Sequence, residues 1–434
     1  MKGREHIWIF SALILAVMLA LVLRQLPEGP VLTGIVEICR FVGDVFKQAL
    51  QMLIVPLIVS SVIAGIASLH GMEGFAKLGG KTVGFYALSS FLAIVVGLVL
   101  VNLIRPGLED GQPNEVIKAA FDESAAEAGE AEKGKIEGAG EKKASDIWDL
   151  FKRMFPKNIV SAATDNGQLL GVITFAILFG IAITRLPVHE IETLRGFFQG
   201  LNDVMIVLTR WVMATAPVGI FALIVPTVYG TGLELFAKMG TYFATVLAAL
   251  GFHFFITLPC LLFFLGRVNP LKHLKAMRTA LLTAFSTSSS SATLPVTMRN
   301  VQDNSGVSKR TSSFTLPLGA TVNMDGTALY ECVAVIFVAQ VAGFDMGFGQ
   351  QFVVVFASLL TSIGVAGIPS ASLVAIILIL RNSGVPYADV APFALLAIDR
   401  PLDMCRTAVN VFGDSCAAVI VARSEGEELE EIRA

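Results

Sequence analysis

The chain consists mainly of long apolar runs separated by short polar links. A helix needs about 20 mostly apolar residues to cross the hydrocarbon core of a bilayer. The runs of that length predict membrane-spanning helices at 7–26, 45–69, 82–104, 158–185, 200–226, 236–265, 314–342 and 390–422. Two more apolar stretches, at 274–298 and 352–380, are interrupted by small polar residues and proline, which is not typical of a plain span.

The two interrupted stretches predict helical hairpins that enter the membrane and return to the same side. Their centres read AFSTSSSSATLP and TSIGVAGIPSAS, and each is followed by a span with a polar cluster. Ser290 precedes Asn323 by 33 residues, the same spacing that separates Ser370 from Asp403. Non-helical backbone at membrane depth is tolerated only where protein or water satisfies it. Two hairpins and two polar spans therefore predict a cavity near the midplane, although the serines could instead be inert residues at helix contacts.

Composition supports a membrane protein and excludes some other classes. Hydrophobic residues make up 54% of the chain and charged residues 15%, with a mean hydropathy of +0.72, whereas soluble domains contain about 25% charged residues. A net charge of −3 is too small to indicate a nucleic-acid partner. The five cysteines form no CxxC pair, so we expect neither a metal site nor a disulfide framework. No small-x-small cleavage site follows the first apolar run, which favours a span over a signal peptide.

Lysine and arginine gather in links that share one side of the membrane if the eight spans and two returning hairpins are correct. These links contain Lys2 and Arg4, Lys77 and Lys81, Arg185 and Arg195, Arg267–Arg278 and Arg299–Arg310. The positive-inside rule places them and both termini in the cytoplasm, so we expect a multi-pass protein of the plasma membrane, or of the inner membrane in a bacterium. The segment 107–146, rich in Glu, Lys, Gly and Ala, is expected to be a flexible outer loop.

The last predicted span places its polar side chains on one face. At 100° per residue they share an arc about 100° wide, and they are Asp399, Asp403, Arg406, Thr407, Asn410 and Asp414. Each charge at the centre of a membrane helix costs about 2.5–3.5 kcal/mol. The guanidinium of Arg406 suits a carboxylate, Asp403 suits an ammonium group, and Asp414 suits a small hard cation. Pairing between Asp403 and Arg406 is the structural alternative.

The preceding polar span, NMDGTALYE at 323–331, adds a second set of acceptors. Gly326 would allow a local break that turns backbone carbonyls inward. Glu331 is a lone acid in apolar surroundings, which favour the neutral form of a carboxyl group, so it could exchange a proton near neutral pH. The alternative is a permanently neutral, hydrogen-bonded side chain.

At these residues the chain resembles the dicarboxylate/amino acid:cation symporters, which include the excitatory amino acid transporters and their prokaryotic homologues. SSSSATLP, NMDGTALYE, AGIPSAS and DxxxDMCRTxVNVxGD match in sequence, order and spacing, and the resemblance covers essentially the whole chain. It implies an all-α polytopic membrane protein with eight transmembrane helices, two re-entrant helical hairpins and inverted repeats. It also implies a homotrimer in membrane lipid that works by an elevator mechanism.

The resemblance implies a division into domains, with a trimerising scaffold and a transport domain that slides across the membrane. The segments are 1–70 for scaffold helices 1–2, 71–106 for transport-domain helix 3, 107–146 for the extracellular loop, 147–230 for scaffold helices 4–5, 231–425 for the rest of the transport domain, and 426–434 for a cytoplasmic tail. The second hairpin would be the outer gate.

Carried over residue by residue, the resemblance implies a site for an acidic amino acid, L-glutamate or L-aspartate. The matching positions are Ser288, Ser289, Ser290, Thr327, Ile368, Pro369, Asp403, Arg406, Thr407 and Asn410. Arg406, helped by Thr327, would hold the side-chain carboxylate. Asp403 and Thr407 would bind the α-amino group, and Asn410 with the serines of the first hairpin would bind the α-carboxylate.

The resemblance also implies three sodium sites and a proton carrier. One sodium site would be formed by Gly319, Asn323, Asn410 and Asp414; a second by Thr321 with the backbone of Ser362 and Ile363; and a third by Tyr86, Ser89, Ser90, Asn323 and Asp325. Glu331 matches the acid of proton-coupled animal glutamate carriers. No cofactor is expected beyond sodium and the proton as coupling ions.

The chain departs from the family pattern at an arginine. Many relatives carry it in the first hairpin or directly after the aspartate at position 403, where Ser288 and Met404 stand here. This absence argues against potassium counter-transport. Ser370 and Ser372 replace residues that are commonly Gly or Gln, which leaves the preferred substrate size open.

The sequence thus predicts a symporter for acidic amino acids, coupled to sodium and a proton. A purely proton-coupled glutamate or C4-dicarboxylate symporter is the alternative of the same class, and a passive channel is a further one. An intramembrane aspartyl protease would need glycine where Val411 stands. An intramembrane serine hydrolase needs a histidine base, and His253, the only histidine placed in the middle of a span, belongs to no predicted polar cluster. We therefore expect no enzyme.

Overall fold

The structure is a computed structural model that is mostly helical. It describes residues 5–27, 29–67, 75–127, 155–164, 169–231, 237–364, 372–388, 390–429 and 432. Four helical stretches of this part are long and apolar enough to cross a membrane, namely Leu78–Ile104, Gly240–Gly266, Lys309–Val341 and Ile398–Ser424. They fit the predicted multi-pass membrane protein, whereas the count of eight spans stays a prediction.

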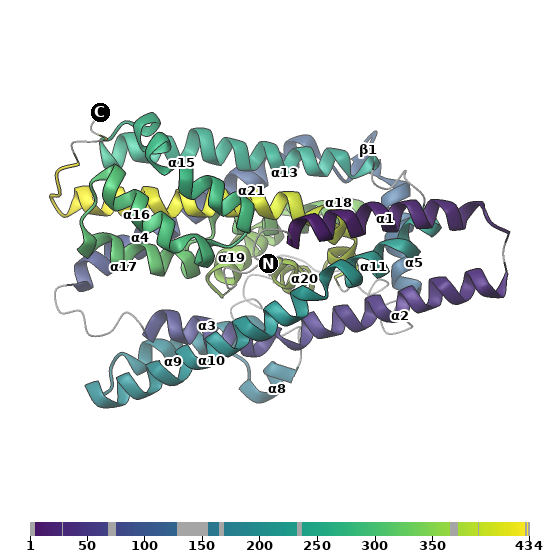
Figure 1. Cartoon of the computed structure of the whole chain (residues 1–434), viewed down its shortest axis with the longest axis horizontal. Coiled ribbons are helices and arrows are strands. Elements are labelled where there is room, and N and C mark those ends of the chain that lie inside the picture. Colours follow the sequence, from purple (N-terminus) through teal and green to yellow (C-terminus); the bar gives the residue numbers. More distant parts are fainter. Residues whose placement is uncertain are drawn as a thin grey trace.

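One group of helices comes from the first half of the chain. Its members are α1 (Glu5–Gln25), α2 (Pro30–Met52), α3 (Ile54–Ala67), α8 (Ile159–Thr164), α9 (Leu169–Ile183), α10 (Val188–Ala214) and α11 (Ala216–Thr231). Both α1 and α2 pack on α11, and α3 packs on α9 and α10; Figure 1 shows α2, α3, α9 and α10 along the lower side. The predicted spans 45–69 and 200–226 were wrong in extent, because each falls on two helices. Pro56 and Pro217 lack the N–H groups that would continue one helix across these breaks.

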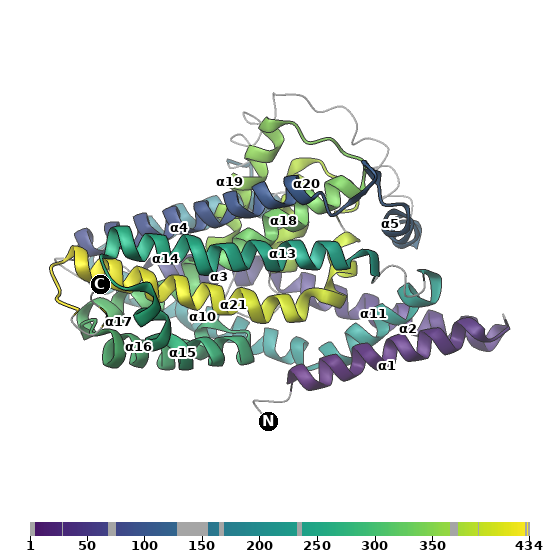
Figure 2. The ribbon, with the colours of Figure 1, turned by 90° about the horizontal axis from the view of Figure 1, so that it is seen from above.

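A second group surrounds the C-terminal helix. Its members are α4 (Phe75–Ile104), α13 (Gly240–Phe252), η3 (His253–Thr257), α14 (Leu258–Leu261), η4 (Leu262–Gly266), α15 (Pro270–Thr287), α16 (Ser290–Ser305), α17 (Lys309–Val322), α18 (Asp325–Val341), α19 (Phe348–Gly364), α20 (Ser372–Ser383) and α21 (Ala391–Ser424). Helix α21 contacts α4, α13, α15, α16, α17 and α18. Its long yellow ribbon runs through the bundle in Figures 1 and 2. The polar face of α21 is therefore covered by protein.

The two interrupted stretches each form a pair of helices packed together, α15 with α16 and α19 with α20. At the first tip Ser288 ends α15 with a φ of 49°, a left-handed conformation that stops a helix. Ser289 then caps α16, and its side chain accepts a hydrogen bond from the Ala292 N–H. The second tip, 365–371, lies outside the described residues, as do the predicted substrate contacts Ile368 and Pro369.

The start of the expected flexible loop is ordered, which corrects the prediction for that part. Strands β1 (Leu108–Glu109) and β2 (Gln112–Pro113) form a hairpin, and α5 (Glu115–Glu127) follows. Phe121 of α5 is fully buried, and the Tyr387 hydroxyl, in the link between α20 and α21, donates a hydrogen bond to Asp122. Burial and the Asp122 carboxylate raise the pKa of that hydroxyl, so it remains a donor. Averaged composition hid this segment, because its buried residues, Ile117, Ala120 and Phe121, are few among polar and charged neighbours. Residues 128–146 lie outside the described part.

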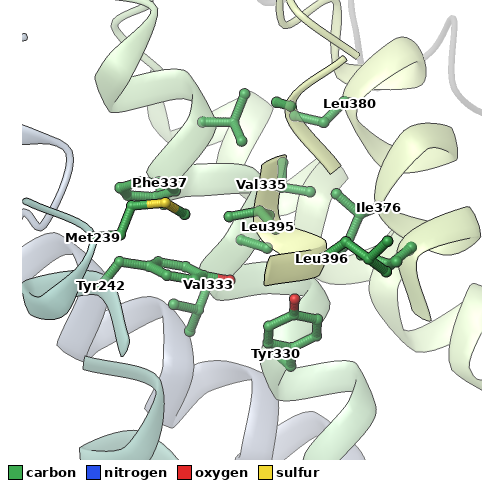
Figure 3. Close-up of a cluster of buried hydrophobic side chains, with 14 of the residues drawn as sticks. Met239, Tyr242, Tyr330, Val333, Val335, Phe337, Ile376, Leu380, Leu395 and Leu396 are labelled. Atoms are coloured by element: carbon green, nitrogen blue, oxygen red, sulfur yellow. The ribbon is translucent and has the colours of Figure 1, made fainter. Parts of the chain in front are cut away.

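Tyr330 connects the apolar core to the polar site. Figure 3 shows Tyr242 of α13, Tyr330 and Phe337 of α18 and Leu395 of α21 in one buried cluster. The rings of Tyr242 and Phe337 stack with centroids 4.3 Å apart. This packing fixes α18 against α13 and α21, and so fixes the polar residues that these helices carry.

The C-terminal tail fastens the ends of several helices. The Glu427 carboxylate accepts hydrogen bonds from the Ser308 N–H at 2.8 Å and the Ser308 hydroxyl at 2.7 Å, and also from Thr311. These groups begin α17, where a negative charge is favourable. Lys81 of α4 pairs with Glu425 at the same end of the bundle.

Glu427→Gln is therefore expected to destabilise the protein by about 1–2 kcal/mol, because charge-assisted hydrogen bonds become neutral ones. Thermal unfolding of the detergent-purified protein measures the effect as a lower melting temperature. Glu428→Gln changes the exposed neighbouring acid and serves as the control. Equal melting temperatures for the two variants would show that Glu427 does not cap α17.

Candidate functional site

The polar stripe of α21 is buried inside the protein. The exposed fractions are 1% for Asp399, 7% for Asp403, 1% for Arg406, 4% for Asn410 and 2% for Asp414. The stripe therefore does not face hydrocarbon. Its charges must be offset by groups on the packed helices or by bound species.

Arg406 is held between two aspartates and an aromatic ring. Its Nη2 atom lies 2.8 Å from Asp403 Oδ1 and 2.9 Å from Asp399 Oδ1. Its Cζ atom lies 3.9 Å from the centroid of the Tyr330 ring, a cation–π contact. The pairing considered as an alternative is thus present, but it uses a single nitrogen. Nε and Nη1 have no hydrogen-bond partner among the described residues, which leaves two donors for a further carboxylate.

Arg400 is a charged member of this cluster that the sequence analysis missed. Its Nη1 atom lies 3.5 Å from Asp403 Oδ2, and the residue is 8% exposed. Two guanidinium groups therefore face the carboxylates of Asp399 and Asp403. Arg400 points 100° away from Asp399 on an ideal helix, outside the arc used for the prediction, but its long side chain reaches back. The i,i+3 spacing of Arg400 and Asp403 was the available signal.

Asn410 connects α21 to the start of α18. Its side-chain carbonyl accepts a hydrogen bond from the Gly326 N–H at 2.8 Å, and its amide donates to Thr327 Oγ1 at 3.2 Å. The break predicted at Gly326 instead falls at Asn323 and Met324, between α17 and α18. Gly326 allows α18 to pack closely against α21, because a Cβ at this position would lie 2.8 Å from the backbone oxygen of Arg406.

A second cluster surrounds the carboxylates of Asp325 and Asp414, which are 0% and 2% exposed. Asp325 Oδ1 accepts hydrogen bonds from Ser90 at 2.7 Å and from Ser89 at 3.2 Å. Asn323 donates to Asp414 Oδ1 at 3.0 Å. No lysine or arginine in the described part of the chain pairs with either aspartate. Two buried carboxylates without a lysine or arginine partner among the described residues form a natural cation site, because a buried negative charge needs a compensating positive charge.

Gly319 keeps this cluster open on its other side. A Cβ at this position would lie 2.4 Å from Asp414 Oδ1 and 2.7 Å from the Tyr86 hydroxyl. That hydroxyl donates to the Thr315 carbonyl at 2.7 Å, which anchors α4 to α17. The structure thus gathers in one place most residues of two predicted sodium sites: Tyr86, Ser89, Ser90, Gly319, Asn323, Asp325 and Asp414.

His253 also belongs to this cluster, so placing it outside every polar cluster was wrong. Its Nε2 atom lies 3.3 Å from Asp325 Oδ2, and both side chains are fully buried. The two residues are 72 positions apart in the chain. No local pattern signals such a contact, because it depends on how the helix that follows Gly240 packs against α18.

Glu331 is fully buried, and its side chain accepts one hydrogen bond within the described part of the chain. Its Oε2 accepts from the Thr361 hydroxyl at 2.8 Å, which joins α18 to α19. Its Oε1 has no hydrogen-bond partner among the described residues. When only one of the two oxygens of a buried carboxyl group is hydrogen-bonded, burial favours the neutral acid over the anion.

The remaining predicted residues lie at the hairpins and on the two polar helices beside them. Ser288 and Ser290 are buried at the first tip, where α15 and α16 pack on α21. The predicted second sodium site draws Thr321 from α17 and Ser362 and Ile363 from α19, two helices that contact each other. Thr407 points its hydroxyl at the Asp403 carbonyl, 2.8 Å away.

Comparison with known proteins decides the family. A model of the sodium:dicarboxylate symporter family matches residues 6–424. The chain belongs to this family. Among similar proteins, excitatory amino acid transporter 3 of Mus musculus is 34% identical over 484 residues, covering 99% of this chain and 87% of the relative.

A second relative in the symporter family is bacterial. The proton/sodium-glutamate symport protein of Geobacillus stearothermophilus is 34% identical, covering 90% of this chain and 88% of the relative. An excitatory amino acid transporter of Caenorhabditis elegans is 35% identical, covering 95% and 86%. The resemblance found in the sequence motifs is thereby confirmed.

Proposed function

We propose that this symporter takes up acidic amino acids, L-glutamate or L-aspartate, together with sodium and a proton. The proposed coupling to sodium rests on the cluster around Asp325 and Asp414. Two buried carboxylates face serine, asparagine and histidine groups, and no described lysine or arginine pairs with them. A small hard cation such as sodium offsets both charges and takes oxygen ligands of this kind.

The acidic substrate is proposed from the arginine cluster. Arg406 presents beside Asp403 two donor nitrogens that no described residue engages, and a guanidinium is the side chain best suited to a carboxylate. Asp403, one helical turn before Arg406, and Thr407, directly after it, offer acceptors for an ammonium group. Relatives named as glutamate transporters support the same substrate class.

Competition for uptake tests the substrate class. Uptake of labelled glutamate into proteoliposomes containing the purified protein would be measured in the presence of excess unlabelled aspartate, succinate or serine. We expect aspartate to compete strongly, and succinate and serine weakly, because only an acidic amino acid offers both charges that Arg406 and Asp403 bind. Competition by succinate equal to that by aspartate would favour the C4-dicarboxylate alternative.

The assembly and the transport cycle are proposed by analogy with the family. The protein would form a homotrimer in the plasma membrane, with both termini in the cytoplasm. Helices α4 and α13–α21 would move as a transport domain against a scaffold of α1–α3 and α8–α11. The two groups described above support this division, since most helix contacts stay within each group. Transport, with no hydrolytic activity, is the role proposed for the buried aspartates and serines.

Glu331 is proposed to carry the proton. Glu331→Gln should leave an uptake rate that no longer changes between about pH 6 and pH 8, because glutamine mimics the neutral acid and cannot release a proton. The parent protein should lose uptake as the external pH rises. Glu192→Gln, at an exposed acid of α10, is the control. An unchanged pH profile in Glu331→Gln would make Glu331 a permanently neutral structural group.

A further inference from the structure

The long helix Gly240–Gly266 changes its hydrogen-bond pattern where it passes Asp325. The Leu258 N–H bonds to the His253 carbonyl five residues back, which defines a π-helical turn. Pro259 follows directly and has no N–H group for the preceding turn. Such turns widen a helix and are frequent at functional sites. This one begins at His253, whose imidazole faces Asp325, while Phe255 of the same turn is 68% exposed on the outer side.

The imidazole is fully buried and has one hydrogen-bond partner among the described residues. Phe254 stacks on Phe412 of α21 with ring centroids 4.7 Å apart, which fixes this turn against the bundle. Nδ1 of His253 has no partner among the described residues, whereas Nε2 lies 3.3 Å from Asp325 Oδ2. A proton on Nδ1 would leave a buried donor unsatisfied. The hydrogen-bond network therefore assigns the proton to Nε2, which donates to the carboxylate.

The two oxygens of Asp325 thus have different partners. Oδ2 is held by His253, and the Cβ that a larger residue would place at Gly413 would lie 2.7 Å from it. Oδ1 lies on the side of Ser89 and Ser90, whose hydroxyl oxygens are 3.2 Å and 2.7 Å away. Three oxygens thus gather on the side that faces away from the histidine.

We propose that His253 is a positioning residue for the cation: by fixing Oδ2 it presents Asp325 Oδ1, with Ser89 and Ser90, as a preformed set of oxygen ligands. The proposal rests on the cation coupling proposed above. Groups that hydrogen-bond to a ligating carboxylate orient it, and their loss typically lowers metal affinity about 10–100-fold. The residue acts through Asp325 and does not itself touch the cation.

Three substitutions separate the hydrogen bond from the shape of the ring. His253→Gln can place an amide N–H near the position of Nε2, His253→Phe keeps a ring without a donor, and His253→Asn places its amide too close to the backbone. The first readout is the sodium concentration that gives half of the thermal stabilisation of the purified protein, with choline chloride keeping the ionic strength constant. The second is the sodium concentration for half-maximal glutamate uptake in proteoliposomes. Phe255→Leu, on the exposed side of the same turn, is the control.

We expect both sodium concentrations to rise at least about 10-fold in His253→Phe and His253→Asn. They should stay within about threefold of the parent in His253→Gln and in Phe255→Leu. If His253→Phe does not fold, the comparison of His253→Gln with His253→Asn gives the same discrimination. The positioning role alone is overturned if His253→Phe or His253→Asn keeps the parent's sodium response. It is also overturned if the sodium concentrations rise equally in His253→Gln and His253→Phe. A parent protein that sodium neither stabilises nor activates overturns the cation proposal, and this one with it.

Discussion

Replacing Arg406 with cysteine is expected to abolish uptake of glutamate and aspartate. The guanidinium lies among Asp399, Asp403 and the Tyr330 ring, and two of its donor nitrogens have no hydrogen-bond partner in the described structure. Losing a buried, charge-assisted contact to a carboxylate costs about 2–5 kcal/mol, and each 1.4 kcal/mol is a factor of ten in affinity. Acidic substrates should therefore lose about 30-fold or more in apparent affinity, while a neutral amino acid such as serine gains relative to them. Labelled uptake in proteoliposomes measures both.

The control for this variant must separate binding from folding. Without Arg406 the carboxylates of Asp399 and Asp403 lose their closest cation, and an unpaired buried charge costs about 3–5 kcal/mol. Asp399→Asn combined with Arg406→Cys removes one of these charges and should restore the yield of folded protein without restoring acidic uptake. Arg185→Gln, at an exposed arginine between α9 and α10, should behave as the parent. Acidic uptake at near parental affinity in the folded double variant would exclude the role assigned to Arg406.

Asp325→Asn is expected to abolish uptake driven by a sodium gradient. Asparagine keeps the size of the side chain but removes the negative charge that a cation would balance. A charge pair about 4 Å apart contributes about 4 kcal/mol at an effective dielectric constant of about 20. The sodium concentration for half-maximal uptake should therefore rise at least about 100-fold. Asp345→Asn, at an exposed acid after α18, is the matched control.

The outcome of Asp325→Asn also distinguishes sodium from proton coupling. A folded variant that keeps the parent's sodium activation would show that the Asp325 cluster binds no coupling cation. A variant that loses sodium activation but still takes up glutamate under a pH gradient would assign the two ions to separate sites, with Glu331 as the candidate for the proton.

The polar stripe and the interrupted segments could be predicted from the sequence because both depend on local geometry. A helical period of 3.6 residues places Asp403, Arg406 and Asn410 on one face wherever that helix lies. Serine and glycine runs inside apolar segments indicate broken helices, and α15–α16 and α19–α20 are such pairs. The motifs around these residues are specific enough to identify the family.

The remaining members of the site depend on contacts between helices that are distant in sequence. His253 meets Asp325 across 72 residues, and Thr361 meets Glu331 across two helices. Arg400 joins the cluster because its long side chain reaches around α21. The role of Gly326 likewise became visible only with the Arg406 backbone beside it. Periodicity places a residue on a face of its helix, but it does not say which other helix covers that face.

Uptake of labelled glutamate under separate ion gradients tests the central claim most directly. Proteoliposomes would receive an inward sodium gradient, an inward proton gradient, both, or neither, with choline replacing sodium. The buried carboxylates of Asp325 and Asp414 predict that concentrative uptake requires sodium and that a proton gradient alone does not support it. Undiminished uptake without sodium, under a pH gradient alone, would contradict a sodium site at these two aspartates.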